Sequence, residues 1–88
     1  FFTMPIHPLD KDYRKTLAED REAFLLADEI GFSEAYCGEH YTDAAENITS
    51  STVFIASLAA ATKNIRLGTG TASLCTSSTH RAIKYIDV

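Results

Sequence analysis

The strongest constraint on the fold of this chain is the alternation of short apolar segments with longer amphipathic ones. Strand-like stretches cover residues 1–6, 33–39 and 65–72, and two helix-like stretches separate them. The second and third strands lie about 30 residues apart, which is the spacing of consecutive βαβ units. Strands joined in this way are nearly always parallel, with right-handed crossovers. The sequence therefore predicts an α/β fold, either an open doubly wound sheet or the beginning of a (β/α)8 barrel.

The two helices are predicted from apolar periodicity and from capping residues. The first is expected to run from Asp10 or Asp12 to Ile30, with Gly31 as its C-terminal cap. Its charged residues are expected to form a solvated face: Asp20, Glu22, Asp28 and Glu29. The second is expected to begin after Thr49, Ser50 or Ser51 and to end near Thr62. Its expected apolar side consists of Val53, Phe54, Leu58 and Ala61.

Composition excludes two classes of function. The formal charge is -4, and the eight Lys and Arg residues are scattered, so a nucleic-acid surface is not expected. No apolar run approaches the roughly 20 residues that cross a bilayer. Cys37 and Cys75 belong to no CxxC or zinc-like pattern, and reduced thiols in a cytoplasmic protein are expected. The glycosylation sequon at residues 47–49 is interpreted as chance.

The length and the first residue of the chain suggest a piece of a longer protein. The chain has 88 residues and begins with Phe1 rather than with a methionine. One alternative is a truncated subunit without catalytic function, because unpaired strand edges tend to pair with other chains. Otherwise the partners expected from composition are small molecules or protein.

Polar residues gather where the predicted strands end. Glu39 and His40 follow the second strand, residues 68–71 end the third, and residues 4–7 end the first. In both candidate folds the carboxyl ends of parallel strands carry the functional groups. His40 could accept or donate a proton near neutral pH, or it could be an ordinary loop histidine. Glu39 could orient that imidazole, face a cofactor, or pair with a neighbouring element.

The glycines of the third strand allow a second interpretation of this edge. Gly68-Thr69-Gly70 is half of a dinucleotide-binding fingerprint, but Ser73 occupies the position of the third glycine. We therefore expect a backbone against which a flat ring can lie, with room for a bulge, or else glycines tolerated in a crowded barrel. His7 is given no role. No metal site is expected, because the nearby residues lack a ligand spacing: Glu39, His40, Asp43 and Glu46.

Several segments together resemble a known family. "FFTMPIHP", "LADEIGFSEAYCGEHYTD" and "TKNIRLGTG" are similar, in order and spacing, to the N-terminal part of the bacterial luciferase-like, flavin-dependent monooxygenases. The resemblance covers residues 1–74 and weakens afterwards. It implies a (β/α)8 TIM barrel, of which this chain would hold the first three strands and two to three helices. Residues 1–88 would then be the N-terminal part of one incomplete luciferase-like barrel domain.

The resemblance also implies an activity for the full-length protein. Reduced FMN, supplied by a separate flavin reductase, would react with molecular oxygen to oxygenate a small organic substrate in the cytoplasm. A deazaflavin-dependent oxidoreductase of the same superfamily is the alternative. A homodimer or other oligomer is implied for the full-length protein, and the 88-residue chain alone would be inactive.

The family pattern implies site residues as well. His40 would be catalytic, and Glu39, Thr69, Gly70 and Thr71 would contact the cofactor. A non-prolyl cis peptide would fall on residues 70–71. Tyr41 stands where the luciferase proper has a second histidine, so aldehyde chemistry is not implied. The phosphate-binding loops of the family would lie beyond residue 88.

Overall fold

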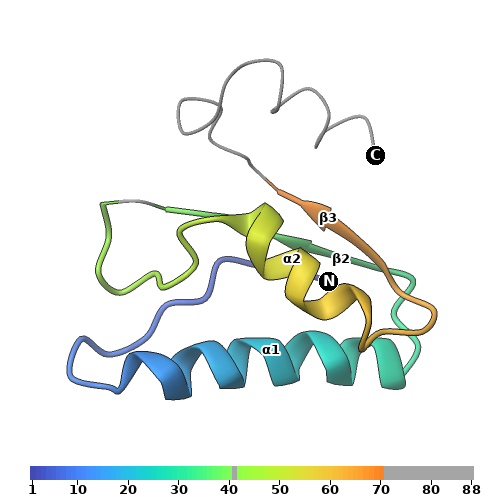
Figure 1. Ribbon diagram of the computed structural model, residues 1–88, viewed down its shortest axis with the longest axis horizontal. Helices are drawn as coiled ribbons and strands as arrows, with labels where there is room; N and C mark the ends of the chain where they lie inside the picture. Colours follow the sequence, from blue (N-terminus) through green and yellow to red (C-terminus); the bar gives the residue numbers. More distant parts are fainter. Residues whose placement is uncertain (41, 71–88) are drawn as a thin grey trace.

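The computed structural model describes residues 1–40 and 42–70, and it contains three strands and two helices in alternation (Figure 1). In chain order the elements are β1 (Phe2–Thr3), α1 (Tyr13–Glu29), β2 (Glu34–Cys37), α2 (Ser51–Ala59) and β3 (Arg66–Thr69). Neither helix is long and apolar enough to cross a membrane within the described residues. The predicted order of elements is confirmed.

The three strands form one parallel sheet in the order β1-β2-β3. Phe2 aligns with Tyr36 on the neighbouring strand, and Tyr36 in turn aligns with Gly68. Both crossover helices contribute to one core together with the sheet. The buried members of this core are Phe24, Ala27, Ala35, Cys37, Ile48, Leu58 and Ile65.

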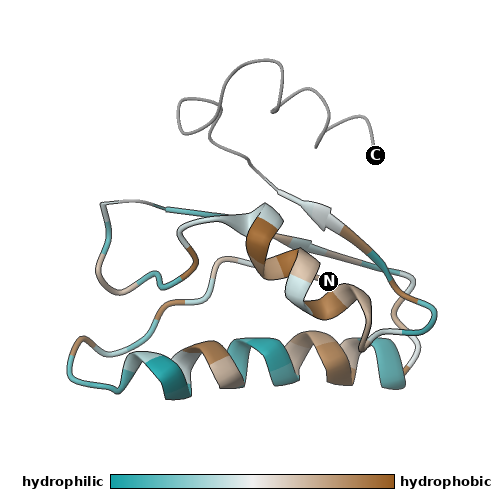
Figure 2. Cartoon of the chain, viewed as in Figure 1, coloured by the Kyte–Doolittle hydropathy of each residue, from teal (hydrophilic) through white to brown (hydrophobic). Residues whose placement is uncertain are grey.

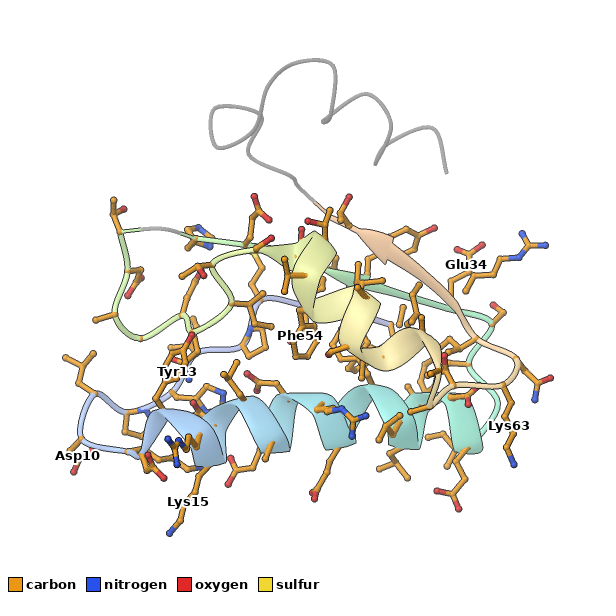
Figure 3. The ribbon with its side chains drawn as sticks, viewed as in Figure 1. Asp10, Tyr13, Lys15, Glu34, Phe54 and Lys63 are labelled. Carbon is orange, nitrogen blue, oxygen red and sulfur yellow. The ribbon has the colours of Figure 1, made fainter. Side chains whose placement is uncertain are left out.

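Alternation along β2 shows which face of the sheet the helices cover. Ala35 and Cys37 are buried, whereas Glu34 and Tyr36 between them are exposed. The Phe54 ring points from α2 toward α1 (Figure 3) and contacts Phe24 at 5.4 Å between ring centroids. Figure 2 shows α1 alternating between apolar and hydrophilic segments, while α2 is mostly apolar. The helices therefore cover one face, and the other face is open within the described residues.

The helix caps agree with the predicted signals. Asp12 caps α1 by accepting a hydrogen bond from the Arg14 amide at 3.4 Å, and Gly31 after the helix has φ of 100°. Ser50 caps α2 by accepting from the Val53 amide. A positive φ of this kind favours glycine, which explains the residue at position 31.

Several expected boundaries and one expected face are wrong, and β2 ends at Cys37 instead of residue 39. β1 ends at Thr3 instead of residue 6, since Pro5 has no amide hydrogen to donate to a sheet. α2 ends at Ala59 instead of Thr62. Val53, assigned to the apolar side of α2, is 69% exposed. In a short helix the sequence alone does not determine whether a residue such as Val53 faces the core, because tertiary packing decides how the helix is rotated.

Asp28 contradicts the predicted solvated face of α1. Its carboxylate accepts three backbone N–H groups of the loop before β3, from Lys63 at 2.8 Å and from Asn64 and Ile65 at 2.9 Å each. These hydrogen bonds stabilise the charged form and lower the pKa of Asp28 below its ordinary value of 3.8. Asp28 thus fixes the entry into β3.

We expect Asp28→Asn to destabilise the full-length protein at neutral pH. The folded pKa of Asp28 is lowered, so its contribution is fully present above 3.8 and is lost as pH falls through the folded pKa. Urea unfolding of wild type and variant from neutral pH into the acid range measures this difference. It should be largest at neutral pH and should shrink in acid. A difference that grows in acid would contradict this role for Asp28.

Candidate functional site at the carboxyl edge of the sheet

The ends of the three strands lie at one edge of the sheet. The Gly38 amide donates to the Thr3 carbonyl at 3.1 Å, and the Gly70 amide donates to the Cys37 carbonyl at 2.8 Å. His40 therefore follows β2 at the same edge at which Gly70 follows β3. The predicted gathering of polar and side-chain-free positions at this edge is observed for the described residues.

His40 is held at both its backbone and its ring. Its amide donates to the Ile48 carbonyl at 3.1 Å, and its Nδ1 forms an ion pair with Oε2 of Glu46. The side chain of His40 is 43% exposed, whereas that of Glu46 is 12% exposed. The imidazole is therefore anchored at one nitrogen and accessible elsewhere.

Glu39 does not orient the imidazole through any hydrogen bond that we observe. Its Oε2 accepts from the Ser51 amide at 2.6 Å and from the Ser51 hydroxyl at 2.8 Å. Ser51 is the first residue of α2, and a carboxylate at a helix N-terminus is favoured by the helix dipole. Glu39 thus ties the end of β2 to the start of α2, as the neighbouring-element interpretation predicted. Its contact with a cofactor stays a prediction.

We expect Glu39→Ala to lower the free energy of unfolding of the flavin-free, full-length protein by about 2 kcal/mol, since two buried donors lose a charged acceptor. Glu39→Gln should cost less, because its amide oxygen can still accept both hydrogen bonds. Urea unfolding measures both values. The control is Glu22→Gln, which removes an equal charge from an exposed position on α1. Equal, small effects for all three variants would contradict the capping role.

Three glycines lie where side chains of the neighbouring strands cross the open face. A Cβ on Gly68 would lie 2.8 Å from Cε1 of the Tyr36 ring. A Cβ on Gly38 would collide with Met4, and one on Gly70 would collide with the Phe2 ring. The chain's own aromatic rings lie against this glycine backbone, and a cofactor ring at the same place stays a prediction. Phe2 nevertheless remains 56% exposed.

Some predicted site residues lie at the limit of the described chain. Thr69 ends β3 and is half-buried. Thr71, the peptide bond between residues 70 and 71, and Tyr41 lie outside the described residues. Their predicted roles stay predictions.

Cys37 lies beneath the edge and is inert in this setting. Its side chain is fully buried, and its thiol donates to the Gly38 carbonyl at 3.3 Å. Burial, followed by the negative charges of Asp20 and Glu39, raises the pKa of the thiol to about 12. A thiol with so high a pKa is a poor nucleophile at neutral pH. Cys37 is therefore a core residue.

Sequence reasoning missed the roles of His7 and Asp20. Nε2 of His7 lies 2.7 Å from Oδ1 of Asp20, and the His7 amide donates to the Ala45 carbonyl at 2.8 Å. Asp20 is buried, contrary to its assignment to a solvated face, and burial raises its pKa more than the His7 contact lowers it. The spacing of Asp20 could have indicated its burial, because it lies four residues before Phe24 and therefore on the same, apolar side of α1.

The potential metal ligands and the glycosylation sequon are two further features of the sequence that the structure addresses. No group of three potential metal ligands occurs within residues 1–40 and 42–70. Asn47 of the sequon is buried, and its amide donates to the Thr16 hydroxyl. A buried asparagine cannot accept a glycan in the folded chain, which agrees with the interpretation of the sequon as chance.

Two curated proteins have sequences similar to this chain. The chain is 41% identical over 73 residues to a 4-hydroxyprotoasukamycin monooxygenase of Streptomyces nodosus subsp. asukaensis. It is 36% identical over 73 residues to a limonene 1,2-monooxygenase of Rhodococcus erythropolis. Each match covers 83% of this chain but only 20% and 19% of the respective relative. The chain thus spans about a fifth of the length of these curated relatives.

Solved structures support the same fold. The oxygenating constituent of 3,6-diketocamphane monooxygenase from Pseudomonas putida, a type II Baeyer-Villiger monooxygenase solved with FMN, superposes with a TM-score of 0.85 at 22% identity. That match covers 97% of this chain and 23% of the other. Apo-MsnO8 superposes with a TM-score of 0.83 at 23% identity, over 96% of this chain and 25% of the other.

A family model also matches this chain. The model described as luciferase-like monooxygenase matches residues 1–84, which is nearly the whole sequence. The chain belongs to the luciferase-like monooxygenase family.

Proposed function

We propose that the full-length protein is a reduced-flavin-dependent monooxygenase that inserts oxygen from O2 into a small organic substrate. The observation that carries this proposal is the placement of His40 and Gly70 at one carboxyl edge of adjacent parallel strands. Functional groups of parallel α/β folds gather at this edge. The names of the two curated relatives and the FMN in one structural neighbour support the choice of chemistry.

The open face of the sheet supports a barrel as the complete fold. Phe2, Met4 and Tyr36 are all exposed on the described part of the chain. In an open doubly wound sheet, further helices would cover such a face, whereas in a (β/α)8 barrel it faces the packed interior. The high TM-scores to members of the luciferase-like fold favour the barrel. We propose that residues 1–88 form its first three strands and associated helices.

The residues at the edge fit a flavin. Glycine at positions 68 and 70 leaves the backbone of β3 accessible to a flat ring, although the Phe2 and Tyr36 rings cross it and would have to turn aside where the ring lies. Both rings are exposed, and turning Tyr36 aside would break the hydrogen bond that its hydroxyl donates to Glu34 at 2.9 Å. Thr69, Gly70 and Thr71 would then hold the ring, with Glu39 beside them. When bound, reduced FMN supplies the electrons that activate O2.

His40 has the properties required of a group that moves a proton in this site. Its ring is partly accessible, and its Nδ1 is anchored, so the remaining ring nitrogen is available to accept or donate a proton. The fully buried Cys37 thiol is excluded from this role by its high pKa. His40 is therefore the proposed catalytic residue of the described segment.

The direct test uses the purified full-length protein under anaerobic conditions. Titration with photoreduced FMN should quench flavin fluorescence on binding, and subsequent mixing with ¹⁸O2 should place one labelled atom in the product. Limonene and 3,6-diketocamphane serve as substrate probes because of the relatives' names. Binding of a reduced deazaflavin in place of FMN would redirect the proposal to hydride transfer. Failure to bind either cofactor would refute it.

The proposed partners can be tested in the same preparation. A separate flavin reductase with its nicotinamide substrate should replace photoreduction, as expected for an enzyme that receives its flavin already reduced. Analytical ultracentrifugation should show a homodimer or larger oligomer of the full-length protein. The 88-residue chain alone should bind no flavin, because most of the proposed barrel would be missing.

A further inference from the structure

The carboxylate of Glu46 contacts the proposed catalytic imidazole. Its Oε2 forms the ion pair with Nδ1 of His40, and both atoms are buried without any other hydrogen-bond partner among the described residues. The Glu46 side chain as a whole is only 12% exposed. A carboxylate this far removed from water requires a partner, because an unpaired charge in such a place is costly. His40 is the ion-pair partner of Glu46 in the part of the chain that the structure describes.

The segment that carries Glu46 is fixed on several sides. The carbonyl of Ala45, the residue before Glu46, accepts a hydrogen bond from the His7 amide at 2.8 Å. The carbonyl of Asn47, the residue after it, accepts one from the Tyr13 hydroxyl at 2.7 Å. Figure 3 shows Tyr13 reaching from the start of α1 toward this loop. The Glu46 amide itself donates to the Asp43 carbonyl at 3.2 Å. A loop held in this manner by the β1–α1 connection and α1 places its carboxylate reproducibly.

The exposure of the His40 side chain is uneven. Nδ1 of His40 is buried, whereas the side chain is 43% exposed, so the accessible surface of the ring lies away from Nδ1. In a neutral imidazole one nitrogen carries the proton, and the hydrogen bond of one nitrogen determines the state of the other. An ionised carboxylate is an acceptor only. It therefore selects the form in which Nδ1 is protonated and Nε2 has a free lone pair.

Resting on the proposed function, we propose that Glu46 is a positioning residue that fixes the tautomer of His40. Glu46 accepts the Nδ1 proton, so that Nε2 is presented to the site as a proton acceptor. The same carboxylate stabilises the imidazolium that forms when Nε2 takes up a proton. Glu46 itself touches neither flavin nor substrate in this role.

The proposal separates the two acidic residues near His40. Glu39, its neighbour in sequence, binds Ser51 on the helix-covered side of the sheet. Glu46, six residues away, is the one that meets the ring. Substitution of Glu46 should therefore affect the imidazole directly, whereas substitution of Glu39 should act mainly through the stability of α2.

The tautomer can be measured without flavin or substrate. Full-length protein labelled with ¹⁵N in its histidines is studied by NMR in alkaline buffer. His40→Asn assigns the signals. The expected spectrum shows His40 with a protonated Nδ1 and an unprotonated Nε2. A spectrum with a proton on Nε2 overturns the proposal, whether or not the Glu46 variants fold.

The functional test compares Glu46→Gln with Glu22→Gln. The amide that Glu46→Gln introduces can present either its oxygen or its NH2 group to Nδ1 of His40, so the tautomer is no longer dictated. We expect kcat to fall at least about tenfold, as part of the 10²- to 10⁴-fold that a proton-transfer group contributes, with flavin affinity unchanged. Glu46→Asp should restore part of the loss. The exposed control should match wild type.

The outcomes distinguish this inference from the proposed function. If the protein binds no flavin, the proposed function fails, while the NMR spectrum still decides the role of Glu46. If flavin binds and oxygenation occurs, but Glu46→Gln alters neither the tautomer nor kcat, then Glu46 is not a positioning residue. Loss of kcat together with an unchanged tautomer also overturns it, because the effect would then be structural.

Discussion

His40→Ala is expected to lower kcat of the full-length protein in the proposed monooxygenation at least about 100-fold while leaving the affinity for reduced FMN nearly unchanged. The imidazole lies at the carboxyl edge of the described strands, is partly accessible, and can accept or donate a proton. Alanine removes that group and leaves the backbone hydrogen bond to Ile48 in place. Anaerobic flavin titration and steady-state turnover measure the two quantities separately.

His40→Asn provides the matched comparison for this variant. Asparagine retains a polar side chain of similar reach but does not titrate, so its kcat should fall as far as that of alanine. Thermal unfolding should show that both variants remain folded. Turnover of either variant within a few-fold of wild type would remove His40 from the mechanism. A loss confined to flavin affinity would reassign it to cofactor binding.

His7→Ala is expected to lower the free energy of unfolding by about 3 kcal/mol, which is the cost of leaving a buried charge without its partner. Asp20 is 6% exposed, and its Oδ2 already has no hydrogen-bond partner among the described residues. Removing the imidazole would leave Oδ1 unpaired as well. Urea unfolding of the flavin-free, full-length protein measures the loss.

The pH dependence of this effect has a definite sign. Burial raises the pKa of Asp20, and the His7 hydrogen bond opposes that rise. Without His7 the folded pKa of Asp20 should be higher still, so the protonated carboxyl is favoured in the folded state. The destabilisation should therefore be largest at neutral pH and should diminish as pH falls through the raised pKa.

A double variant provides the control for His7. In His7→Ala/Asp20→Asn the buried charge is absent, so the double variant should be more stable than His7→Ala alone. A cost below about 0.5 kcal/mol for His7→Ala, typical of a surface position, would contradict the buried pair. An unchanged cost in the double variant would instead assign the loss to packing of the loop.

The order of elements could be predicted from the sequence because it depends on local signals. Asp12, Ser50 and Gly31 act within a turn of their own helices, and their roles can be read from neighbouring residues. Parallel pairing follows from the length of the connections. The short extent of β1 was misjudged, although Pro5 carried the necessary signal.

The polar contacts could not be predicted because they join residues that are distant in sequence. Asp28 meets a loop 35 to 37 residues later, and Glu39 meets Ser51 twelve residues later. A helical periodicity shows that Asp28 and Asp20 lie on a helix, but not which loop returns to them. For the same reason the sequence left open whether Glu39 orients His40, faces a cofactor or pairs with a neighbouring element, whereas the fold brings Glu46 to the ring.

The central claim is that His40 and the glycine backbone after β3 form one flavin-binding edge. A crystal structure of the full-length protein with FMN tests it most directly. We predict that the isoalloxazine ring lies against the backbone of residues 68–71, with Nε2 of His40 facing it from the neighbouring strand. A flavin bound at another edge, or a structure in which His40 and Gly70 lie on opposite sides of the ring-binding region, would contradict the claim.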